Sequence, residues 1–195
     1  MFRSLFVITK ENCKIVFRQS TYVAVIFLFL IPYLYGIPNL NSERSASCLG
    51  QLVSLIGIPL FVSILEAEQD SDIRDTVVIK SFPYYTSVFM RMIFAMLLSF
   101  VLVYVFSLYM LYQGCEFPIN IYVVRTVEIS ALIGGTGLLI SAMFRKTLVG
   151  ILVSVGFVFL FYNDFMFMVF DGIPRFVMAI EILLYSIILL LCKKY

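Results

Sequence analysis

"YTSVFMRMIFAMLLSFVLVYVFSLYMLYQ", residues Tyr85 to Gln113, is an apolar run whose only charged residue is Arg91. A helix needs about 20 mostly apolar residues to cross the hydrocarbon core of a bilayer, which is about 30 Å thick. At about 1.5 Å per residue this run would extend about 43 Å as a helix, so it must tilt or project beyond the bilayer. The run therefore predicts a membrane-spanning helix.

The rest of the chain has the same character. Its 195 residues are 62% hydrophobic and 13% charged, with a mean hydropathy of +1.04, whereas soluble domains are about half apolar and about a quarter charged. The apolar runs are continuous and lack the alternation of barrel strands. The sequence predicts an all-α polytopic integral membrane protein, one transmembrane domain over residues 1–195. Six spans are expected: Thr21–Ile37, Cys48–Leu65, Tyr85–Gln113, Ile121–Phe144, Thr147–Phe170 and Phe176–Cys192.

The basic residues predict the orientation of the spans. Cytoplasmic flanks of membrane spans carry an excess of Lys and Arg. One side holds eleven of them, against three on the other, which predicts that both termini are cytoplasmic in a multi-pass protein of the cell membrane, a bacterial plasma membrane. The eleven are Arg3, Lys10, Lys14, Arg18, Arg74, Lys80, Arg91, Arg145, Lys146, Lys193 and Lys194, and the three are Arg44, Arg125 and Arg175. Arg91 is interpreted as an interfacial anchor.

Residues 1–20 form an amphipathic pattern before the first span. Read as a helix, they place apolar residues such as Phe2, Phe6 and Phe17 on one face, and Lys10 and Arg18 on the other. This pattern is typical of a helix that lies in the membrane interface, with its basic face toward anionic lipid headgroups. An ordinary basic flank that only sets topology is the alternative.

Several kinds of chemistry are excluded by composition. Histidine is absent, so histidine zinc sites and Ser-His or Cys-His pairs cannot form. A G-x-x-x-x-G-K-[ST] phosphate loop is also missing. We expect neither an enzyme nor a protein that binds a metal, cofactor or nucleic acid. Cys48 and Cys115 fall on the outer side, where they would be apolar fillers or, less simply, a disulfide.

The segment "EAEQDSDIRDTVVIKSFP", residues 66–83, is the largest loop and holds five of the twelve acidic residues. Ser71 or Asp72 can cap a short helix, Lys80 lies in its last turn, and Pro83 follows it. Five carboxylates beside an anionic inner leaflet favour a protein partner over lipid. The alternative is that residues 66–83 form a solvated linker that only connects two spans.

This arrangement resembles the transmembrane permease subunits of type-2 ABC exporters. That family has an interfacial helix, six spans with both ends inside, and a short capped helix between spans two and three. Within the loop, Glu68, Asp75-Thr76, Ser81-x-Pro83 and Arg91 resemble a degenerate family pattern. Asp75 stands where the family commonly has Gly, and the outer loops are short. The segment "NDFMFMVFDGIPR", residues 163–175, resembles a reduced version of the family's re-entrant helices.

The resemblance implies partners and a role for the acidic loop. Residues 66–83 would contain a coupling helix that seats in a separate nucleotide-binding ATPase subunit, which would hold ATP and Mg²⁺. The family works with two permease subunits, so this chain would be half of a homo- or heterodimer. The residues expected to contact the ATPase are Glu66, Glu68, Asp70, Asp72, Ile73, Arg74, Asp75, Thr76, Val77 and Lys80.

Ionisable residues at membrane depth are costly and usually face protein or water. Arg125 and Glu128 are three residues apart and can pair on one helix face. Glu181 has a comparable depth in the last span, and Asp164 is a further candidate. Arg125, Glu128 and Glu181 are expected to cluster, either lining a substrate path or clamping two helices together.

The fourth span contains "SALIGGTGLLISA", residues 130–142. Ser130 and Gly134, and Ala131 and Gly135, have the spacing of small residues that lets helices approach closely. We expect close helix packing there, with helix bending as the alternative.

The leading hypothesis is a non-catalytic export permease that moves an amphipathic or lipid-like molecule, such as an antimicrobial peptide. The competing hypothesis is an ion-coupled secondary carrier or channel that uses the intramembrane charges. No internal repeat with matching broken helices supports the second hypothesis.

Overall fold

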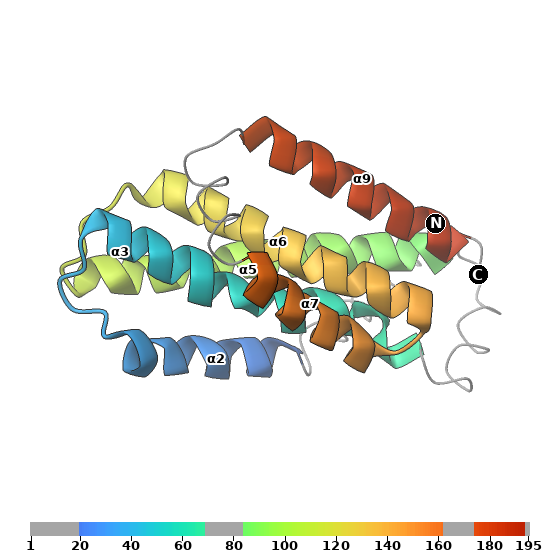
Figure 1. The fold of residues 1–195 in the computed structure, drawn as a ribbon, viewed down its shortest axis with the longest axis horizontal. Helices are drawn as coiled ribbons and strands as arrows, with labels where there is room; N and C mark the ends of the chain where they lie inside the picture. The colour runs from blue at the N-terminus through green and yellow to red at the C-terminus, as the bar shows by residue number, and fades with distance from the viewer. Residues whose placement is uncertain (1–19, 69–83, 162–173, 194–195) are drawn as a thin grey trace, which may run out of the picture.

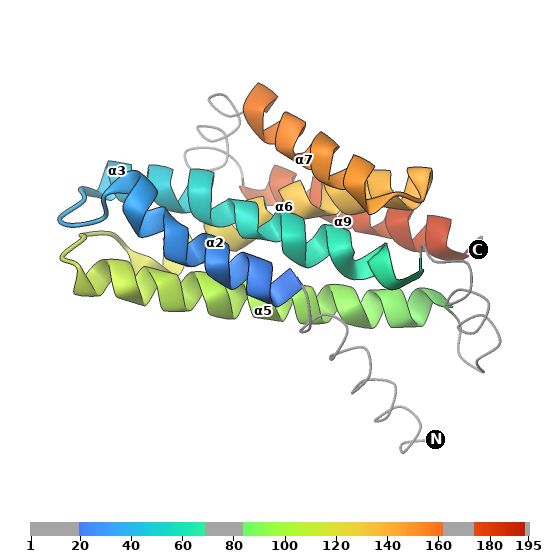
Figure 2. The same ribbon diagram turned by 90° about the horizontal axis from the view of Figure 1, so that it is seen from below.

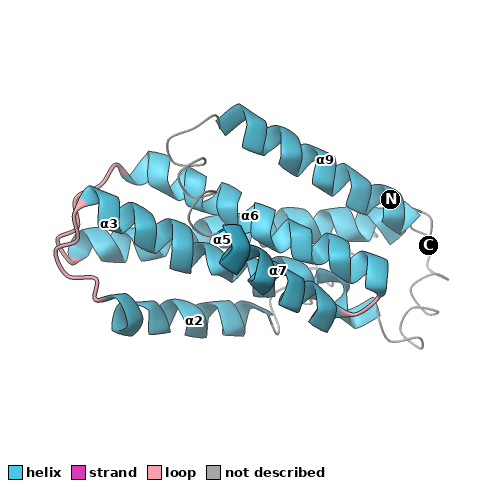
Figure 3. Cartoon of the chain, in the orientation of Figure 1, coloured by secondary structure: helices cyan, strands magenta, loops and turns pink. Residues whose placement is uncertain are grey.

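The computed structural model describes residues 20–68, 84–161 and 174–193. All secondary structure in these ranges is helical, and none of the described residues forms a strand (Figure 3). The all-α prediction is therefore confirmed. The expected interfacial helix in residues 1–20 lies almost wholly outside the described residues.

Long helices form an elongated bundle in which most of them run along the long axis (Figure 1). The helices and their bounds are α2 (Ser20–Tyr35), α3 (Ser42–Ser47), α5 (Tyr84–Tyr112), α6 (Ile119–Phe144), α7 (Thr147–Phe161) and α9 (Pro174–Lys193). The second span continues from α3 through four short turns that do not have α-helical hydrogen bonding: η1 (Cys48–Leu52), η2 (Val53–Ile56), η3 (Ile58–Val62) and η4 (Ser63–Glu68).

Helix ends match the predicted spans to within a few residues, apart from the start of the second and the end of the fifth, Phe170, which lies outside the described residues. The second begins at Ser42, six residues before the predicted Cys48, because the polar segment Ser42–Ser47 is already helical. Asn41 precedes it with extended backbone angles (φ −66°, ψ 162°), and Glu43 lies in its first turn, near the positive end of the helix dipole. This polar turn was not predicted to be helical, although Asn41 and Glu43 are residues that favour the start of a helix.

Three described helices are long and apolar enough to cross a membrane: Ser42–Glu66, Tyr85–Tyr112 and Ile119–Phe144. The segments Ser20–Tyr35, Thr147–Phe159 and Ile182–Leu191 are apolar but shorter. Three of the six predicted spans are thus confirmed as helices long and apolar enough to cross a membrane. That these three and the other three do cross one stays a prediction.

The helix α6 lies at the centre of the bundle. It packs against the second span, α5, α7 and α9, while α2 packs on the second span (Figures 1 and 2). Glu128 and the segment 129–135 are buried on α6, and large apolar side chains of α2, α5, α7 and α9 are exposed. Apolar exteriors and small or polar residues at helix contacts are typical of helices packed in lipid.

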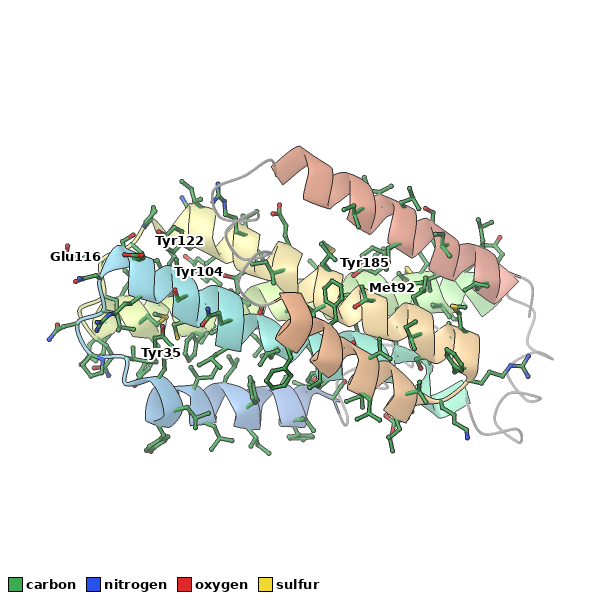
Figure 4. The ribbon with its side chains drawn as sticks, in the orientation of Figure 1. Tyr35, Met92, Tyr104, Glu116, Tyr122 and Tyr185 are labelled. Atoms are coloured by element: carbon green, nitrogen blue, oxygen red, sulfur yellow. The ribbon has the colours of Figure 1, made fainter. Side chains whose placement is uncertain are left out.

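One end of the bundle, here called the tyrosine end, holds the connections 36–41 and 113–118. Tyr35, Glu116 and Tyr122 lie there (Figure 4). The two connections are joined because Asn39 N donates to Gln113 O (3.2 Å), and Glu116 N donates to Leu40 O (3.4 Å). Gly114 has a φ of 83°, and the Asn39 side chain occupies the space where a Cβ would lie. The tyrosine end is therefore a cross-linked cap.

Cys115 and Cys48 are buried free thiols, so the disulfide considered for them is not formed in this structure. The thiol of Cys115 donates to Ile37 O at 3.2 Å. Cys48 lies in the apolar core with Cys115, as expected for small apolar fillers.

The opposite end, here called the basic end, holds the connection 145–146 and the two ends of the acidic loop. Arg145 terminates α6 in a left-handed conformation with a φ of 54°, a common way for helices to stop. Arg145 and Lys146 therefore lie at the end opposite Arg44 (Figure 1). The orientation of these two ends relative to a membrane stays a prediction.

Candidate functional site

The acidic loop connects two antiparallel helices. The second span ends at Glu68, and α5 begins at Tyr84. Glu66 is exposed on the last turn before the loop, and Glu68 is helical in its backbone. The remaining expected contact residues lie outside the described ranges: Asp70, Asp72, Ile73, Arg74, Asp75, Thr76, Val77 and Lys80.

Arg91 joins the helices at the two ends of this loop. It belongs to α5, yet its Nη1 donates a hydrogen bond to the Ile64 carbonyl of the second span at 3.1 Å. Arg91 is 3% exposed. The interpretation of Arg91 as an interfacial anchor is therefore wrong, because its side chain turns inward rather than toward headgroups.

The bond between Arg91 and Ile64 is favourable for two reasons. A carbonyl oxygen has two lone pairs, so Ile64 O can accept a hydrogen bond from the guanidinium in addition to one within its own helix. Ile64 also lies near the end of a helix, where the negative end of the helix dipole is balanced in part by a cation. A charged donor in a buried setting contributes about 1.5–3 kcal/mol. The two helices that flank the acidic loop are thus held together just inside its base.

Three glycines of α6 let neighbouring helices approach closely. Gly134 faces the second span, where an added Cβ would lie 2.5 Å from Gly57 O and 2.7 Å from Phe61 Cδ2. Gly137 faces Gly150 of α7 and Val62 of the second span, and Gly135 faces Leu184 and Tyr185 of α9. Close packing, rather than bending, is therefore confirmed as the role of this glycine cluster.

Tyr185 fixes the position of α9 against α6. Its hydroxyl donates to Ala131 O at 2.9 Å, and its ring packs 6.2 Å from that of Phe61 on the second span, measured between centroids. Figure 4 shows Tyr185 near the middle of the bundle, far from Tyr35 and Tyr122. Tyr185 thus joins three helices at a point away from either end.

A buried seam runs between the second span and α6 around Gly57. A Cβ on Gly57 would overlap the Ser130 carbonyl and lie 2.7 Å from Ser130 Oγ. Among the described residues, the buried Ser130 hydroxyl has no hydrogen-bond partner. Buried hydroxyls without partners are uncommon and costly. This seam was not predicted from the sequence, although the segment Gly57-Ile58-Pro59 marks its position.

Glu128 lies on α6, on the side that carries Ala131 and Gly135, because these positions are three and seven residues further along the helix. It is 7% exposed, and the positive charge of Arg125 acts on its carboxyl group. No hydrogen bond to that carboxyl group is present within the described part of the chain. The predicted proximity of Arg125 and Glu128 is consistent with this interaction.

Position 181 of α9 lies one turn before Tyr185, and Glu128 lies about one turn before Ala131. Both helices run from the tyrosine end toward the basic end (Figure 1). The Tyr185–Ala131 hydrogen bond therefore places position 181 at a level close to Glu128. The side chain of Glu181 and all of Asp164 are outside the described parts, so the predicted cluster stays a prediction.

These features define an all-helical protein with three helices suited to crossing a membrane. In residues 20–68, 84–161 and 174–193, no group of three His, Cys, Asp or Glu residues is arranged to hold a metal ion. No protein-family model, curated protein or solved structure matches the chain. The candidate site is accordingly the Arg91 contact, the seam at Gly57 and the charged residues of α6.

Proposed function

We propose that this chain is the transmembrane permease subunit of a type-2 ABC exporter. The proposal is supported by six apolar helices within the described residues and by an acidic segment that connects the second span to α5. The chain would form the substrate path and would not catalyse a reaction. Its substrate would be an amphipathic or lipid-like molecule, with antimicrobial peptides as one class.

The observation that carries this proposal is the buried hydrogen bond between Arg91 and Ile64. A loop attached to two independent helices would absorb a push by bending. Because the helices are joined just inside its base, a force on residues 69–83 would move both together. This is the mechanical requirement for a coupling loop.

The proposed assembly contains two permease subunits and two nucleotide-binding ATPases. The ATPases bind ATP and Mg²⁺ and would contact the carboxylates of residues 66–83. This places the basic end of the bundle in the cytoplasm and the tyrosine end outside, in a bacterial plasma membrane. The apolar exteriors of α2, α5, α7 and α9 would contact lipid or the second permease.

The test is recovery of a phosphate-loop ATPase with the tagged chain, from its native membrane solubilised in mild detergent. Reversing Asp70, Asp72 and Asp75 together to Lys should reduce the recovered ATPase at least about tenfold, which corresponds to about 1.4 kcal/mol of binding free energy. Reversing Glu43 and Glu116, at the tyrosine end, is the matched control and should leave recovery unchanged. Equal recovery from both variants would refute the coupling role.

An ion-coupled carrier or channel is the second candidate, favoured by the burial of Glu128 at membrane depth. Glu128→Gln separates the two functions. A carrier would lose ion-driven uptake and would have no ATPase partner. The exporter would retain its ATPase partner, because Glu128 is far along α6 from the basic end.

A further inference from the structure

The second span is the least regular helix in the described chain. Its hydrogen bonds close wide π turns in Cys48–Leu52 and Ile58–Val62, and narrow 3₁₀ turns in Val53–Ile56 and Ser63–Glu68. π turns are rare in proteins and occur mostly at functional sites, and 3₁₀ turns within a helix often mark hinges. The alternation of π and 3₁₀ turns in one helix therefore needs a physical explanation.

The local sequence supplies that explanation. Pro59 cannot donate the backbone hydrogen bond that its position would make in an α-helix. Ser54 Oγ donates to Gly50 O at 2.5 Å, and Ser63 Oγ donates to Pro59 O at 2.6 Å. Such bonds from a serine to its own preceding turn compete with regular helix bonding and bend helices. The Val53 amide N–H is shared between Cys48 O and Leu49 O, which are its π and α acceptors.

The neighbouring helix meets the second span at a backbone contact. At Gly57 the second span presents no side chain, and its backbone lies against the carbonyl and hydroxyl of Ser130. Beyond Gly57, toward the basic end, Ile58, Phe61 and Val62 pack against α6, so these are the contacts that a turn of the second span would exchange. The part before the seam is attached to the cross-linked tyrosine end.

We infer that the second span is a two-state element that exchanges π for α hydrogen bonding near Gly57, so that its part next to the acidic loop turns against α6. Removing one π turn shifts the following residues by about 1.5 Å and rotates them by about 100°. In the present state the buried Ser130 hydroxyl lacks a partner among the described residues. In the other state it donates to a carbonyl of the second span.

This inference deepens the proposed function and rests on it for the role of the rotation, which would carry motion of residues 69–83 to the centre of the bundle. The change in hydrogen bonding itself does not require an ATPase. It can therefore be tested on the purified chain in lipid bilayers, and the outcome is independent of whether an ATPase partner exists.

The experiment measures a distance by pulsed electron paramagnetic resonance between spin labels at Glu66→Cys and Phe144→Cys. Both sites are exposed, on the second span and on the end of α6. The four native cysteines are first replaced, with Cys115→Ser to keep a donor to Ile37 O. We expect two distances in this parent chain, because rotation of the second span moves one label and leaves the other in place.

Ser130→Ala should shift the ratio of the two distances roughly tenfold toward the present state, because it removes a hydroxyl that is unpartnered only in that state. If alanine disturbs the packing at the seam, Ser130→Gly is a second variant that also removes the hydroxyl. The matched control is Ser154→Ala, since Ser154 Oγ already donates to Ile133 O at 3.2 Å, between α7 and α6. It should leave the ratio unchanged.

A single distance in the parent chain would overturn the inference, as would a ratio that Ser130→Ala and Ser130→Gly leave unchanged. If ATPase recovery nevertheless falls when Asp70, Asp72 and Asp75 are reversed, the proposed function stands without this device. If the distances respond but no ATPase is recovered, the two-state helix stands and the exporter proposal falls.

Discussion

The second span and α6 are parallel neighbours that both contain glycines but differ in the regularity of their helical hydrogen bonding. α6 remains a regular α-helix over Ile119–Phe144 although it contains Gly134, Gly135 and Gly137. The second span departs from α geometry although it has only Gly50 and Gly57. Glycine alone therefore does not disturb a helix at this depth. The second span also combines Pro59 with two serines bonded to the preceding turn, a combination that α6 lacks.

This difference assigns separate tasks to the two helices. The glycines of α6 are contact points, each filled by a neighbour. The irregular turns of the second span lie between the fixed tyrosine end and the acidic loop. One helix is the fixed centre of the bundle, and the other is the element whose hydrogen bonding can change. Mutations at matched positions can test this division.

The largest effect is expected from filling the contact at Gly134. Gly134→Val would force side-chain atoms against Gly57 O and Phe61, and overpacking of this kind costs about 3 kcal/mol. The free energy of unfolding, measured by titration with sodium dodecyl sulfate in mixed micelles, should fall by that amount.

The matched control for Gly134 is Gly156 on α7, where an added Cβ would have no neighbour within 4 Å. Gly156→Ala should leave the free energy of unfolding within about 0.5 kcal/mol of the parent, as for a surface position. Equal losses at Gly134 and Gly156 would mean that the glycines of α6 are not contact points.

A smaller effect is expected from Arg91→Leu. This change removes the bond to Ile64 O and leaves that carbonyl without this buried donor, at a cost of about 2 kcal/mol. The same titration measures the loss. Arg91→Lys should recover only part of it, since a lysine presents a single ammonium group instead of a planar fork. No loss of stability in Arg91→Leu would remove the observation on which the coupling role depends.

The smallest effect is expected from Tyr185→Phe, which keeps the ring against Phe61 and removes only the hydroxyl that donates to Ala131 O. Hydrogen bonds between membrane helices contribute about 0.6 kcal/mol. Stability should fall by about that amount. A loss as large as that of Arg91→Leu would show that the contact of α9 with α6 stabilises the bundle as much as the contact of α5 with the second span.

Much of the fold could be predicted from apolar runs and their breaks. The ends of α5 and α6 were predicted to within two residues, because tyrosines, prolines and basic residues bound them. Ser42–Ser47 was missed, since a polar turn that extends a span resembles a loop in composition. The small-residue spacing of α6 correctly predicted close packing, but spacing alone does not tell which helix each glycine meets.

The candidate site was harder to predict, because its residues come from different helices. Arg91 resembled an anchor at the membrane surface, since sequence does not reveal that Ile64 O lies within its reach. The seam at Gly57 depends on a carbonyl and a hydroxyl of Ser130, which are ordinary until a neighbour approaches. Arg125 and Glu128 lie on one helix, so their pairing could be predicted from their spacing, and it stays a prediction.

The central claim is that residues 66–83 couple this chain to an ATPase, and ATP hydrolysis tests it most directly. The phosphate-loop ATPase recovered with the chain would be assayed with the chain in bilayers, alone and with Asp70, Asp72 and Asp75 reversed to Lys. The account predicts that the parent chain changes the rate of ATP hydrolysis at least about tenfold and that the reversed chain does not, a difference of about 1.4 kcal/mol in activation free energy. Equal rates with both chains would contradict it.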